Sequence, residues 1–486
     1  MSEEVGCRLS SIITPCVAAA HEPPVEAGWY TKRDAILFVL LLFVVIQVIS
    51  ELVPPFQSPD EVNHIKRAYT LAQGNWLPMR EGDSAGGAVD SGLLAYMDSF
   101  SALPFDYSAK EDRALLAHTE NIRWSYKRVF SDFSNTALYF PIPYVPQAAA
   151  LNVGERLHLP IGASYSLART FSLVATLAII LFALLCYPVP MIVIAVFLLP
   201  MTLFQMASAS MDSVCFAVSL LAASLFMRGS DKALRFGPSL LGVLALCLFV
   251  LATVRQNLIF FTLLPAALYP LRRSNLCLAL AAFTFLLATG WSLYLTRSFT
   301  ILGPYDIAPH EVIRFYGTSP LALASISLKT ITNISLLTAW TDSFIGNLGG
   351  LDTPLAPGVY AAITILLVVL AIATLKWTEV RSIRISSICL VGGGVVATGI
   401  LVFLMLIAWT PRQAPFIQGV QGRYFVPILT LSAFPLFAGR ISPMRRSFCL
   451  VIILILLHIS LLSTTSALIG RYWLSQSEHS NQMRTS

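Results

Sequence analysis

Residues 35–64 read AILFVLLLFVVIQVISELVPPFQSPDEVNH, and this stretch decides what kind of protein the chain is. Its first sixteen positions, up to Ser50, are almost entirely apolar and carry no charge. A membrane-spanning α-helix needs roughly 20 such residues, with a range of about 17–25. The stretch therefore predicts a membrane helix at 35–53, followed closely by two adjacent carboxylates and an imidazole, at Asp60, Glu61 and His64.

The whole chain has the composition of a membrane protein. Of its 486 residues, 56% are hydrophobic and 12% are charged, whereas a soluble domain averages about 25% charged residues. We expect an all-α polytopic fold of about eleven (ten to thirteen) membrane helices, because the strands of a β-barrel would be shorter and would alternate. The predicted helices cover residues 35–53, 166–187, 190–206, 213–228, 238–253, 257–271, 275–296, 355–375, 385–408, 424–440 and 447–468.

Lysine and arginine gather in alternate connectors between these helices. The connectors concerned lie at 32–33, 228–235, 272–273, 376–384 and 440–446. Because basic residues mark the cytoplasmic side of a membrane protein, the pattern predicts a multi-pass protein of the plasma (inner) membrane with a cytoplasmic N-terminus. The expected organisation is a cytosolic tail at 1–34, one membrane domain at 35–468 with outward-facing loops at 54–165 and 297–354, and a C-terminal tail at 469–486.

The first outward loop is long and acidic, since residues 54–165 hold twelve of the 26 acidic residues of the chain. Loops of this length are usually functional. Ser58 as N-cap, Pro59 at the first position and Glu61 three residues after the cap predict a helix that starts at Ser58 and stops at Gly74. We expect a flexible excursion at 82–92 and an amphipathic segment on the membrane surface at 109–130.

The predicted helix places several functional side chains on one face. Asp60, His64 and Arg67 are spaced at i, i+4 and i+7, and Glu61 and His64 at i, i+3. Two structural explanations stay open, since Glu61 can close a capping box and Asp60 can complement the helix dipole. A divalent metal is a further alternative for Asp60, Glu61 and His64, because carboxylate and imidazole groups bind such ions. Additional ligands would then come from elsewhere, and the candidates are Asp212, His310 and Glu311.

Two charged residues elsewhere are candidates for the same outer rim. Arg423 precedes a membrane helix and suits a lipid phosphate, because a guanidinium binds two oxygens at once and stays charged; the alternative is an interfacial anchor. Asp212 starts another membrane helix and is either functional or an N-cap. Tyr139 and Tyr144 can stack on sugar rings or belong to an interfacial aromatic belt.

Several motifs resemble known membrane families. PDEVNHIKRAYTLAQGNWLP (59–78), YFPIPYVPQ (139–147) and SLARTFSLVATL (166–177) resemble the polyprenyl-phosphate-dependent GT-C glycosyltransferases, which include protein mannosyltransferases and lipid A aminoarabinose transferases. NTALYFPIPYVPQ (135–147), SASMDS (208–213), GLDTPL (350–355) and VQGRYFVP (420–427) resemble more closely the bacterial domain of unknown function 2142 family. This second resemblance spans about residues 35–440.

The resemblance to the transferases implies roles for individual residues. Asp60 matches their loop aspartate, which acts as a base or positions the acceptor, Glu61 matches its partner, and Arg169 matches the arginine that begins their second membrane helix. Two positions depart from the pattern. His64 stands where the transferases usually have tyrosine, and Tyr139 stands near the place of a phosphate-contacting lysine, so phosphate binding would need another residue here.

The combined reading is a glycosyltransferase. It would move a sugar from a polyprenyl-phosphate carrier to an envelope glycan, lipid or protein, with Asp60 and Glu61 as catalytic residues. His64, Arg67, Arg169, Asp212, Arg423, Tyr139 and Tyr144 would bind substrate. We also expect membrane lipid as a partner. We expect no nucleic-acid partner, since no basic run is long enough to bind one. A transporter or flippase of lipid-linked saccharides and an envelope polysaccharide polymerase or ligase are the alternatives.

Overall fold

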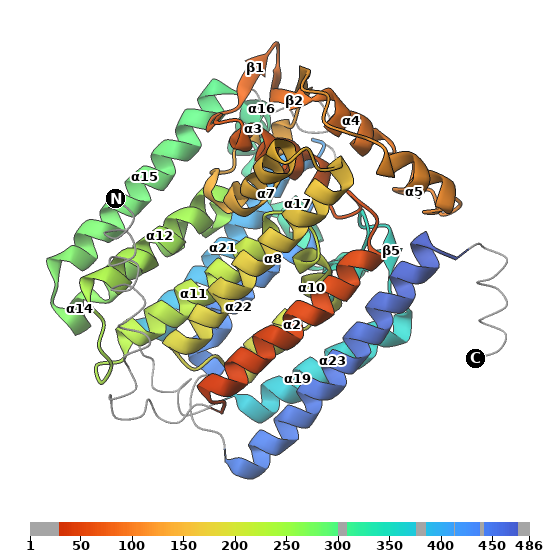
Figure 1. Cartoon of the computed structure of the whole chain (residues 1–486). Helices are drawn as coiled ribbons and strands as arrows, with labels where there is room; N and C mark the ends of the chain where they lie inside the picture. The colour runs from red at the N-terminus through yellow and green to blue at the C-terminus, as the bar shows by residue number, and fades with distance from the viewer. Residues whose placement is uncertain (1–28, 300–308, 376–384, 413, 438–441, 475–486) are drawn as a thin grey trace, which may run out of the picture.

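The computed structural model describes residues 29–299, 309–375, 385–412, 414–437 and 442–474. This part of the chain is mostly helical, and its long helices run side by side from one end of the molecule to the other (Figure 1). The predicted tails up to residue 28 and from residue 475, the basic connector at 376–384, and residues 440–441 of the connector at 440–446 lie outside the described residues.

Among the described residues, seven helices are long and apolar enough to cross a membrane. They are α2 (Lys32–Leu52), α8 (Ile161–Cys186), α11 (Asp212–Ser230), α15 (Asn275–Ser298), α19 (Pro357–Thr374), α21 (Ile385–Trp409) and α23 (Pro443–Tyr472). The pair α17 (Pro320–Ile331) and α18 (Ile334–Gly346), bent by 61°, would add an eighth, and α12 (Pro238–Val254) and α22 (Phe425–Phe437) are apolar but shorter. The all-α polytopic fold is confirmed, although fewer helices than the predicted eleven reach spanning length.

Prolines explain why two predicted spans are interrupted. The segment predicted at 190–206 forms α9 (Met191–Phe197) and α10 (Pro200–Met206), because a proline disfavours the helical conformation of the residue before it and Leu199 is extended. The segment predicted at 257–271 becomes the 3₁₀ helix η3 (Gln256–Leu263) and the short helices α13 (Leu264–Ala267) and α14 (Tyr269–Arg272), which begin around Pro265 and Pro270.

The core of the helical bundle lies around α11. This helix packs against α8, α12 and α22, and all its residues from Asp212 to Phe226 are buried. The outer helices instead keep much of their apolar surface exposed, as at Phe283 of α15 and Ile372 of α19. A helix that is apolar all round belongs in such an interior. Asp212, the first residue of α11, is therefore also buried, at the end of the bundle where the first loop lies.

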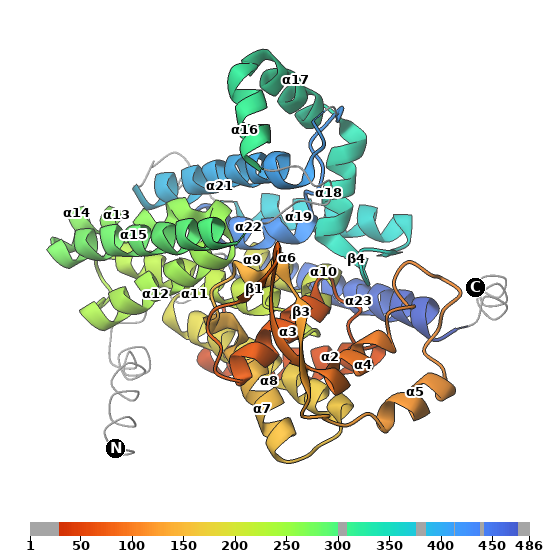
Figure 2. The same ribbon diagram turned by 90° about the horizontal axis from the view of Figure 1, so that it is seen from above.

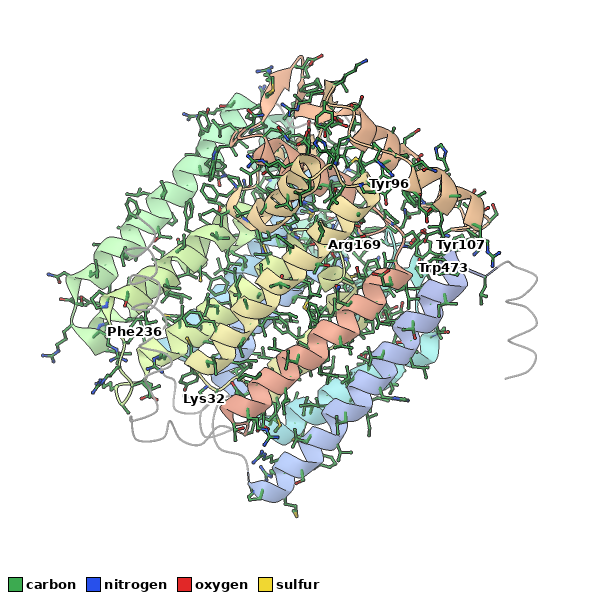
Figure 3. The ribbon with its side chains drawn as sticks, viewed as in Figure 1. Lys32, Tyr96, Tyr107, Arg169, Phe236 and Trp473 are labelled. Atoms are coloured by element: carbon green, nitrogen blue, oxygen red, sulfur yellow. The ribbon has the colours of Figure 1, made fainter. Side chains whose placement is uncertain are left out.

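The two ends of the bundle differ as the basic connectors predict. Lys32 and Phe236 lie at one end, whereas Tyr96 and Tyr107 of the first loop lie at the other (Figure 3). The basic connectors at 32–33, 228–235 and 272–273 therefore lie opposite the first loop. Seen from above, α16 (Pro309–Thr318), α17 and α18 project on the opposite side of the bundle from the first loop (Figure 2).

The first loop is a folded unit rather than an irregular excursion. Its helices are α3 (Glu61–Ala72), α4 (Ser91–Asp98), α5 (Arg113–Glu120), α6 (Ser134–Ala137), η2 (Ile142–Tyr144) and α7 (Val145–Arg156). Strands β1 (Met79–Glu81), β2 (Ser84–Asp90) and β3 (Arg128–Asp132) form an antiparallel sheet in the order β1-β2-β3. Val89 pairs with Val129, and Arg80 pairs with Ala85.

One prediction for this loop was wrong, and the placement of 109–130 on the membrane surface stays a prediction. The 82–92 segment is the central strand of the sheet and the start of α4, and Asp90 caps that helix by accepting hydrogen bonds from the N–H groups of Gly92 and Leu93. The 109–130 segment contains one helix of eight residues, followed by β3. The small residues of β2 hide its strand character, because strand propensity reflects fit to a packed surface more than intrinsic preference.

The helix α23 closes the end of the molecule at which the first loop lies. Two short strands, β4 (Asn347–Leu348) and β5 (Thr353–Pro354), pair next to the end of α23. Arg471 forms an ion pair of 3.0 Å with Asp352, which also accepts a hydrogen bond from the N–H of Phe105 at 2.8 Å. Residues 469–472, predicted to start the C-terminal tail, therefore belong to α23 and hold both outer loops together.

Candidate active site

The helix that carries the acidic motif starts later than the sequence predicts. α3 begins at Glu61, and Asp60 has a left-handed backbone (φ 62°) without a capping bond from its side chain. Half of the predicted capping box is nevertheless present, since the N–H of Ser58 donates to Glu61 Oε2 at 3.3 Å. The predicted stop is confirmed, because Gly74 takes a positive φ of 87° after the helix. The carboxylate of Asp60 is therefore free of helix capping.

Asp60 belongs to a cluster of four charged residues, which we call the charge cluster: Asp60, Asp212, Arg255 and Arg423. Arg423 Nη2 lies 2.7 Å from Asp60 Oδ2, and Arg423 Nη1 lies 2.9 Å from Asp212 Oδ2. Arg255 forms a further ion pair with Asp212. The cluster joins residues that are up to 363 positions apart in the chain, and its two negative and two positive charges balance.

Asp60 is the exposed member of the charge cluster. Its side chain is 40% exposed, whereas the side chains of Asp212 and Arg423 are 0% and 2% exposed. Partial burial raises the pKa of Asp60, but the Arg423 guanidinium and, to a lesser extent, His64 lower it, so the pKa lies below its ordinary value. The site thus presents an ionised carboxylate to solvent, backed by a buried guanidinium.

Arg423 is fixed from all sides. Its Nε donates to Gln421 Oε1 at 2.7 Å, and its Nη1 also points to the carbonyl of Pro59 at 3.4 Å. The preceding Gly422 packs so closely on α18 that an added Cβ would lie 2.0 Å from the backbone nitrogen of Phe344. Only glycine permits that approach. The turn η4 (Gly422–Tyr424) thus presses Arg423 against the start of α3.

A second group of polar side chains lies beside Asp60. Asn135 donates to Asp60 Oδ1 at 3.0 Å and accepts from Asn63 at 2.8 Å. His64 Nδ1 and the hydroxyl of Tyr144 share a hydrogen bond of 2.8 Å, and the ring of Tyr139 stacks on His64 with 6.2 Å between centroids. Asn135 therefore contacts the exposed carboxylate directly, whereas the two aromatic candidates, Tyr139 and Tyr144, pack on His64, and Tyr144 is fully buried there.

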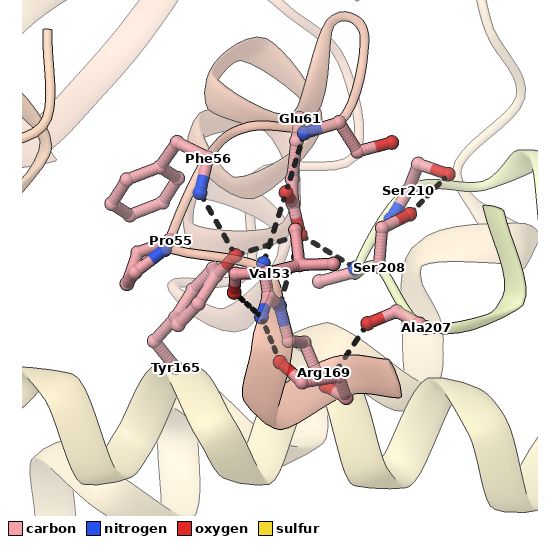
Figure 4. Close-up of polar contacts among 12 residues, drawn as sticks. Val53, Pro55, Phe56, Glu61, Tyr165, Arg169, Ala207, Ser208 and Ser210 are labelled. Atoms are coloured by element: carbon pink, nitrogen blue, oxygen red, sulfur yellow. Dashed lines mark hydrogen bonds and ion pairs between the residues drawn. The ribbon is translucent and has the colours of Figure 1, made fainter. Parts of the chain in front are cut away.

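Glu61 and Arg169 form a separate, closed network (Figure 4). Glu61 is fully buried and accepts hydrogen bonds from the Tyr165 hydroxyl at 2.8 Å and from the N–H of Ala209 at 2.7 Å. Arg169 reaches both Glu61 oxygens at 3.4 Å. Its remaining contacts go to the carbonyls of Ser50, Val53 and Pro54.

This network ties the end of α2 to α3 and α8. No face of the Glu61 carboxylate is open to a substrate, because its side chain is 0% exposed. We therefore expect Glu61 and Arg169 to position the start of α3, in place of the catalytic and substrate-binding roles that the sequence suggested. Arg67 is also fully buried, and it donates to the carbonyls of Asn75 (3.4 Å) and Trp76 (2.6 Å), which hold the turn after α3.

The side chains do not fit the metal alternative. Asp60 faces Arg423, Glu61 faces Arg169 and His64 faces Tyr144, so their donor atoms do not converge. Of the additional ligands considered, Asp212 is paired with Arg423 and Arg255, and Glu311 forms an ion pair with Arg412. Within the described ranges, no three His, Cys, Asp or Glu side chains gather in a way that could hold a metal ion.

Three residues of the site, Arg255, Asn135 and Gln421, were not predicted from the sequence. Arg255 lies between the predicted helices at 238–253 and 257–271, and its guanidinium pairs with Asp212 and lies 4.6 Å from the ring centroid of Tyr424. A single arginine between two apolar segments is the signal that could have revealed it, since such a charge needs a partner. Asn135 and Gln421 carried no signal of their own beyond their place in the quoted motifs.

Comparison with known proteins supports the resemblance to the second family. The family described as "Predicted membrane protein (DUF2142)" matches residues 37–432. The chain belongs to this family. Three of the four segments that resemble this family, which contain Asn135, Asp212 and Arg423, meet Asp60 at the charge cluster and its border. The fourth, at 350–355, lies instead beside the end of α23, where Asp352 pairs with Arg471.

One solved structure is similar over most of the chain. It is the crystal structure of ArnT from Cupriavidus metallidurans bound to undecaprenyl phosphate, with 14% sequence identity and a TM-score of 0.36, over 94% of this chain and 80% of that chain. A score of this size does not establish a common fold. No curated protein matches the chain.

Proposed function

We propose that this membrane protein is a GT-C-type glycosyltransferase that moves a sugar from a polyprenyl-phosphate carrier to a hydroxyl of a cell-envelope acceptor. The observation that supports it best is the pairing of an exposed, ionised Asp60 with the buried Arg423 at the outer rim of the helical bundle. A carboxylate and a guanidinium at one point supply what the reaction needs, a proton acceptor and a stabiliser of the leaving phosphate.

Each charged group has a defined part in this reaction. The acceptor oxygen forms a bond to the anomeric carbon of the sugar while the bond from that carbon to the phosphate oxygen breaks. The acceptor proton passes to Asp60, and the phosphate leaves with the bonding electrons. Arg423 stabilises the negative charge that develops on the phosphate through the N–H groups of Nη2, since a hydrogen bond from a guanidinium to an anion is strengthened by the two charges.

The geometry links donor binding to activation of the base. Asp212 and Gln421 hold Nη1 and Nε of Arg423, so Nη2 is the group next to the exposed Asp60. A donor phosphate that reaches Nη2 competes with Asp60 for it. As the phosphate takes that position, the Asp60 carboxylate loses its counter-ion and becomes a stronger base for the acceptor hydroxyl.

The site lies at the end opposite the basic connectors, which supports an extracytoplasmic reaction at the plasma membrane. Both substrates are then available there. The polyprenyl chain of the donor stays in the bilayer beside the helices, and the acceptor approaches from the envelope side of the first loop.

The direct test compares Asp60→Asn with the unaltered protein in a transfer assay with a polyprenyl-phosphate-linked sugar. Asparagine keeps the size and can still accept a hydrogen bond, but it cannot take a proton, so we expect turnover to fall on the order of 100-fold or more. Asp83→Asn is the matched control, because Asp83 belongs to the same loop and its side chain is 81% exposed. Full activity of stable Asp60→Asn protein would overturn the proposal.

A further inference from the structure

A groove in the first loop lies away from the charge cluster. It has a volume of about 420 Å³ and is lined by Ala72, Gln73, Tyr126, Arg128, Asn152, Glu155, Arg156 and His158. These residues come from the C-terminal ends of α3 and α7, from the start of β3 and the segment before it, and from the turn after α7. A concave surface that combines an aromatic ring with convergent polar side chains is the usual form of a small-molecule site.

The groove and the charge cluster lie at opposite ends of one helix pair. α3 and α7 run in the same direction, because His64 bonds to Tyr144 near their first residues and Tyr69 bonds to Glu155 near their last. Asp60 and Gln73 lie at the two ends of α3, a separation of about 20 Å at the helical rise of 1.5 Å per residue. A ligand that reaches from one to the other must be a chain of several units.

The backbone of the groove is held in an unusual conformation. Tyr126 and His158 both have positive φ angles, 59° and 53°, which cost a non-glycine residue of order 1–3 kcal/mol. His158 follows the end of α7, where glycine is the usual residue, as Gly74 is after α3. Here the histidine ring instead holds the hydroxyl of Tyr126 at 2.6 Å. Such strain persists where the conformation has a use, and this one keeps the exposed Tyr126 ring at the groove.

Hydrogen bonds orient a carboxylate inside the groove. Gln73 Nε2 donates to Glu155 Oε2 at 2.6 Å, the Tyr69 hydroxyl donates to Oε1 at 3.1 Å, and Arg128 Nη2 lies 3.7 Å from Oε1. The Glu155 side chain is 10% exposed. Asn152 is fixed next to it, because its Nδ2 donates to the carbonyl of Ala72 at 3.2 Å, which leaves the side-chain oxygen to accept another bond.

The groove carries an excess of positive charge. Arg128 and Arg156 add two charges and Glu155 removes one. Arg128 remains 43% exposed despite its contact with Glu155. The Arg156 residue is exposed, and its side chain forms no hydrogen bond or ion pair with another residue in the described part of the chain. A free guanidinium next to a partly engaged one is suited to a carboxylate, which it binds through two parallel hydrogen bonds.

We propose that this groove binds an acidic oligosaccharide, with a uronate-type carboxylate on Arg156 and Arg128 and a sugar ring on Tyr126. Glu155 and Asn152 accept hydrogen bonds from the sugar hydroxyls. The inference rests on the proposed function in one respect, since it makes the acidic glycan the acceptor of the transferase. The bound chain then runs along the α3–α7 pair and places a hydroxyl near Asp60.

The test measures binding alone, in nanodiscs of zwitterionic lipid by titration calorimetry, with Asp60→Asn protein so that no transfer occurs. The probes are tetragalacturonate and the uncharged maltotetraose. We expect tetragalacturonate to bind at least tenfold more tightly than maltotetraose. Its affinity should fall as salt is added, because salt screens the charges. Equal affinity for both probes, or no binding of tetragalacturonate, would overturn the proposal while leaving the transfer reaction at Asp60 open to its own assay.

Variants assign the binding to the groove. Arg156→Gln should weaken tetragalacturonate binding about tenfold and leave maltotetraose binding unchanged. Tyr126→Asn should weaken both probes, since asparagine tolerates the positive φ angle but offers no ring. Arg113→Gln, at an exposed arginine of α5 outside the groove, is the matched control and should change neither. If Arg156→Gln binds tetragalacturonate like the control, the site assignment is wrong.

Discussion

At the scale of single residues, the Arg423 guanidinium is the group whose geometry matters most. Its three nitrogens contact different partners, Asp60, Asp212 and Gln421, at 2.7–2.9 Å. A lysine ammonium keeps the charge but cannot reproduce the planar fork. We expect Arg423→Lys to lower transfer activity at least tenfold, measured as kcat/KM in the same assay as for Asp60→Asn.

The matched control for Arg423→Lys is Arg113→Lys, at an arginine exposed on α5. A conformational loss would appear as a lower Tm, so both variants are melted in the same detergent. If Arg423→Lys protein is as active as the unaltered protein, the residue serves only as an interfacial anchor, which is the alternative that the sequence left open.

His64 should make the free energy of unfolding depend on pH. The pKa of His64 is lowered from 6.5 to about 4, chiefly by burial. The nearby carboxylates of Asp60 and Asp212 raise this pKa, and the guanidinium groups of Arg423 and Arg255 lower it further. The unfolded chain therefore binds this proton at higher pH than the folded chain does. The His64 contribution to the free energy of unfolding is complete above pH 6.5 and declines between pH 6.5 and 4, by up to about 3 kcal/mol.

The measurement for His64 is unfolding at a series of pH values for the unaltered protein and His64→Gln. We expect the variant to lack this part of the decline between pH 6.5 and 4, so that the two stability curves converge as the pH falls. His118→Gln, at an exposed histidine of α5, should follow the unaltered protein. Parallel curves for the unaltered protein and His64→Gln would show that His64 is not buried in its neutral form.

At the scale of elements, the Glu61–Arg169 network joins three helices, and its loss should affect folding before chemistry. Glu61→Gln leaves Arg169 buried with the carbonyls of α2 and its connector but without a counter-charge. Breaking a buried ion pair on one side costs about 3–5 kcal/mol. We expect a clearly lower unfolding midpoint in denaturant, whereas Glu81→Gln, at an exposed position of β1, should leave it unchanged.

The contrast between neighbours separates the two networks. Asp60→Asn should lose turnover at nearly normal stability, and Glu61→Gln should lose stability first. If the Glu61 variant keeps its stability and loses turnover, Glu61 acts on the substrate after all.

The same pair of residues shows how far the sequence predicts the site. Spacing on a helix put Asp60, His64 and Arg67 on one face, but their side chains have different partners: Asp60 contacts Arg423 and Asn135, whereas His64 contacts Tyr144. Periodicity could not reveal that Arg67 turns inward to the carbonyls of Asn75 and Trp76, or that Arg255 arrives from a distant turn. Those contacts depend on tertiary packing, which no local pattern encodes.

Although only seven of the described helices, or eight with the bent pair α17–α18, are long and apolar enough to cross a membrane, the apolar segments themselves were predictable across the whole molecule. Their continuity was not, since Pro200 and Pro265 interrupt two of them inside the protein, where neighbouring helices can satisfy the freed backbone groups. The sheet of the first loop was also missed, because the strand Ser84–Asp90 is rich in glycine and alanine and its partner β3 lies about forty residues further along the chain.

The orientation of the whole molecule is open to a labelling experiment. Asp83→Cys lies in the first loop, and Ala233→Cys lies in a basic connector at the other end of the bundle; both positions are exposed. If basic connectors are cytoplasmic, a membrane-impermeant thiol reagent should label Asp83→Cys in intact cells and Ala233→Cys only after permeabilisation. The reverse pattern would place the charge cluster on the cytoplasmic side and exclude the envelope reaction.

The ion pair between Arg471 and Asp352 also sets an order of assembly. Tyr472 accepts the N–H of Glu111 at 2.9 Å, and Lys110 donates to the carbonyl of Arg471 at 2.8 Å, so a loop made early in synthesis is fastened by the last helix. Lys110 precedes Arg471 by 361 positions, so the first loop gains these contacts only after α23 has been synthesised. A chain truncated before Arg471 would keep its membrane helices but would lack the contacts between α23 and the first loop. We expect proteases of the quality-control system to degrade such a chain more readily.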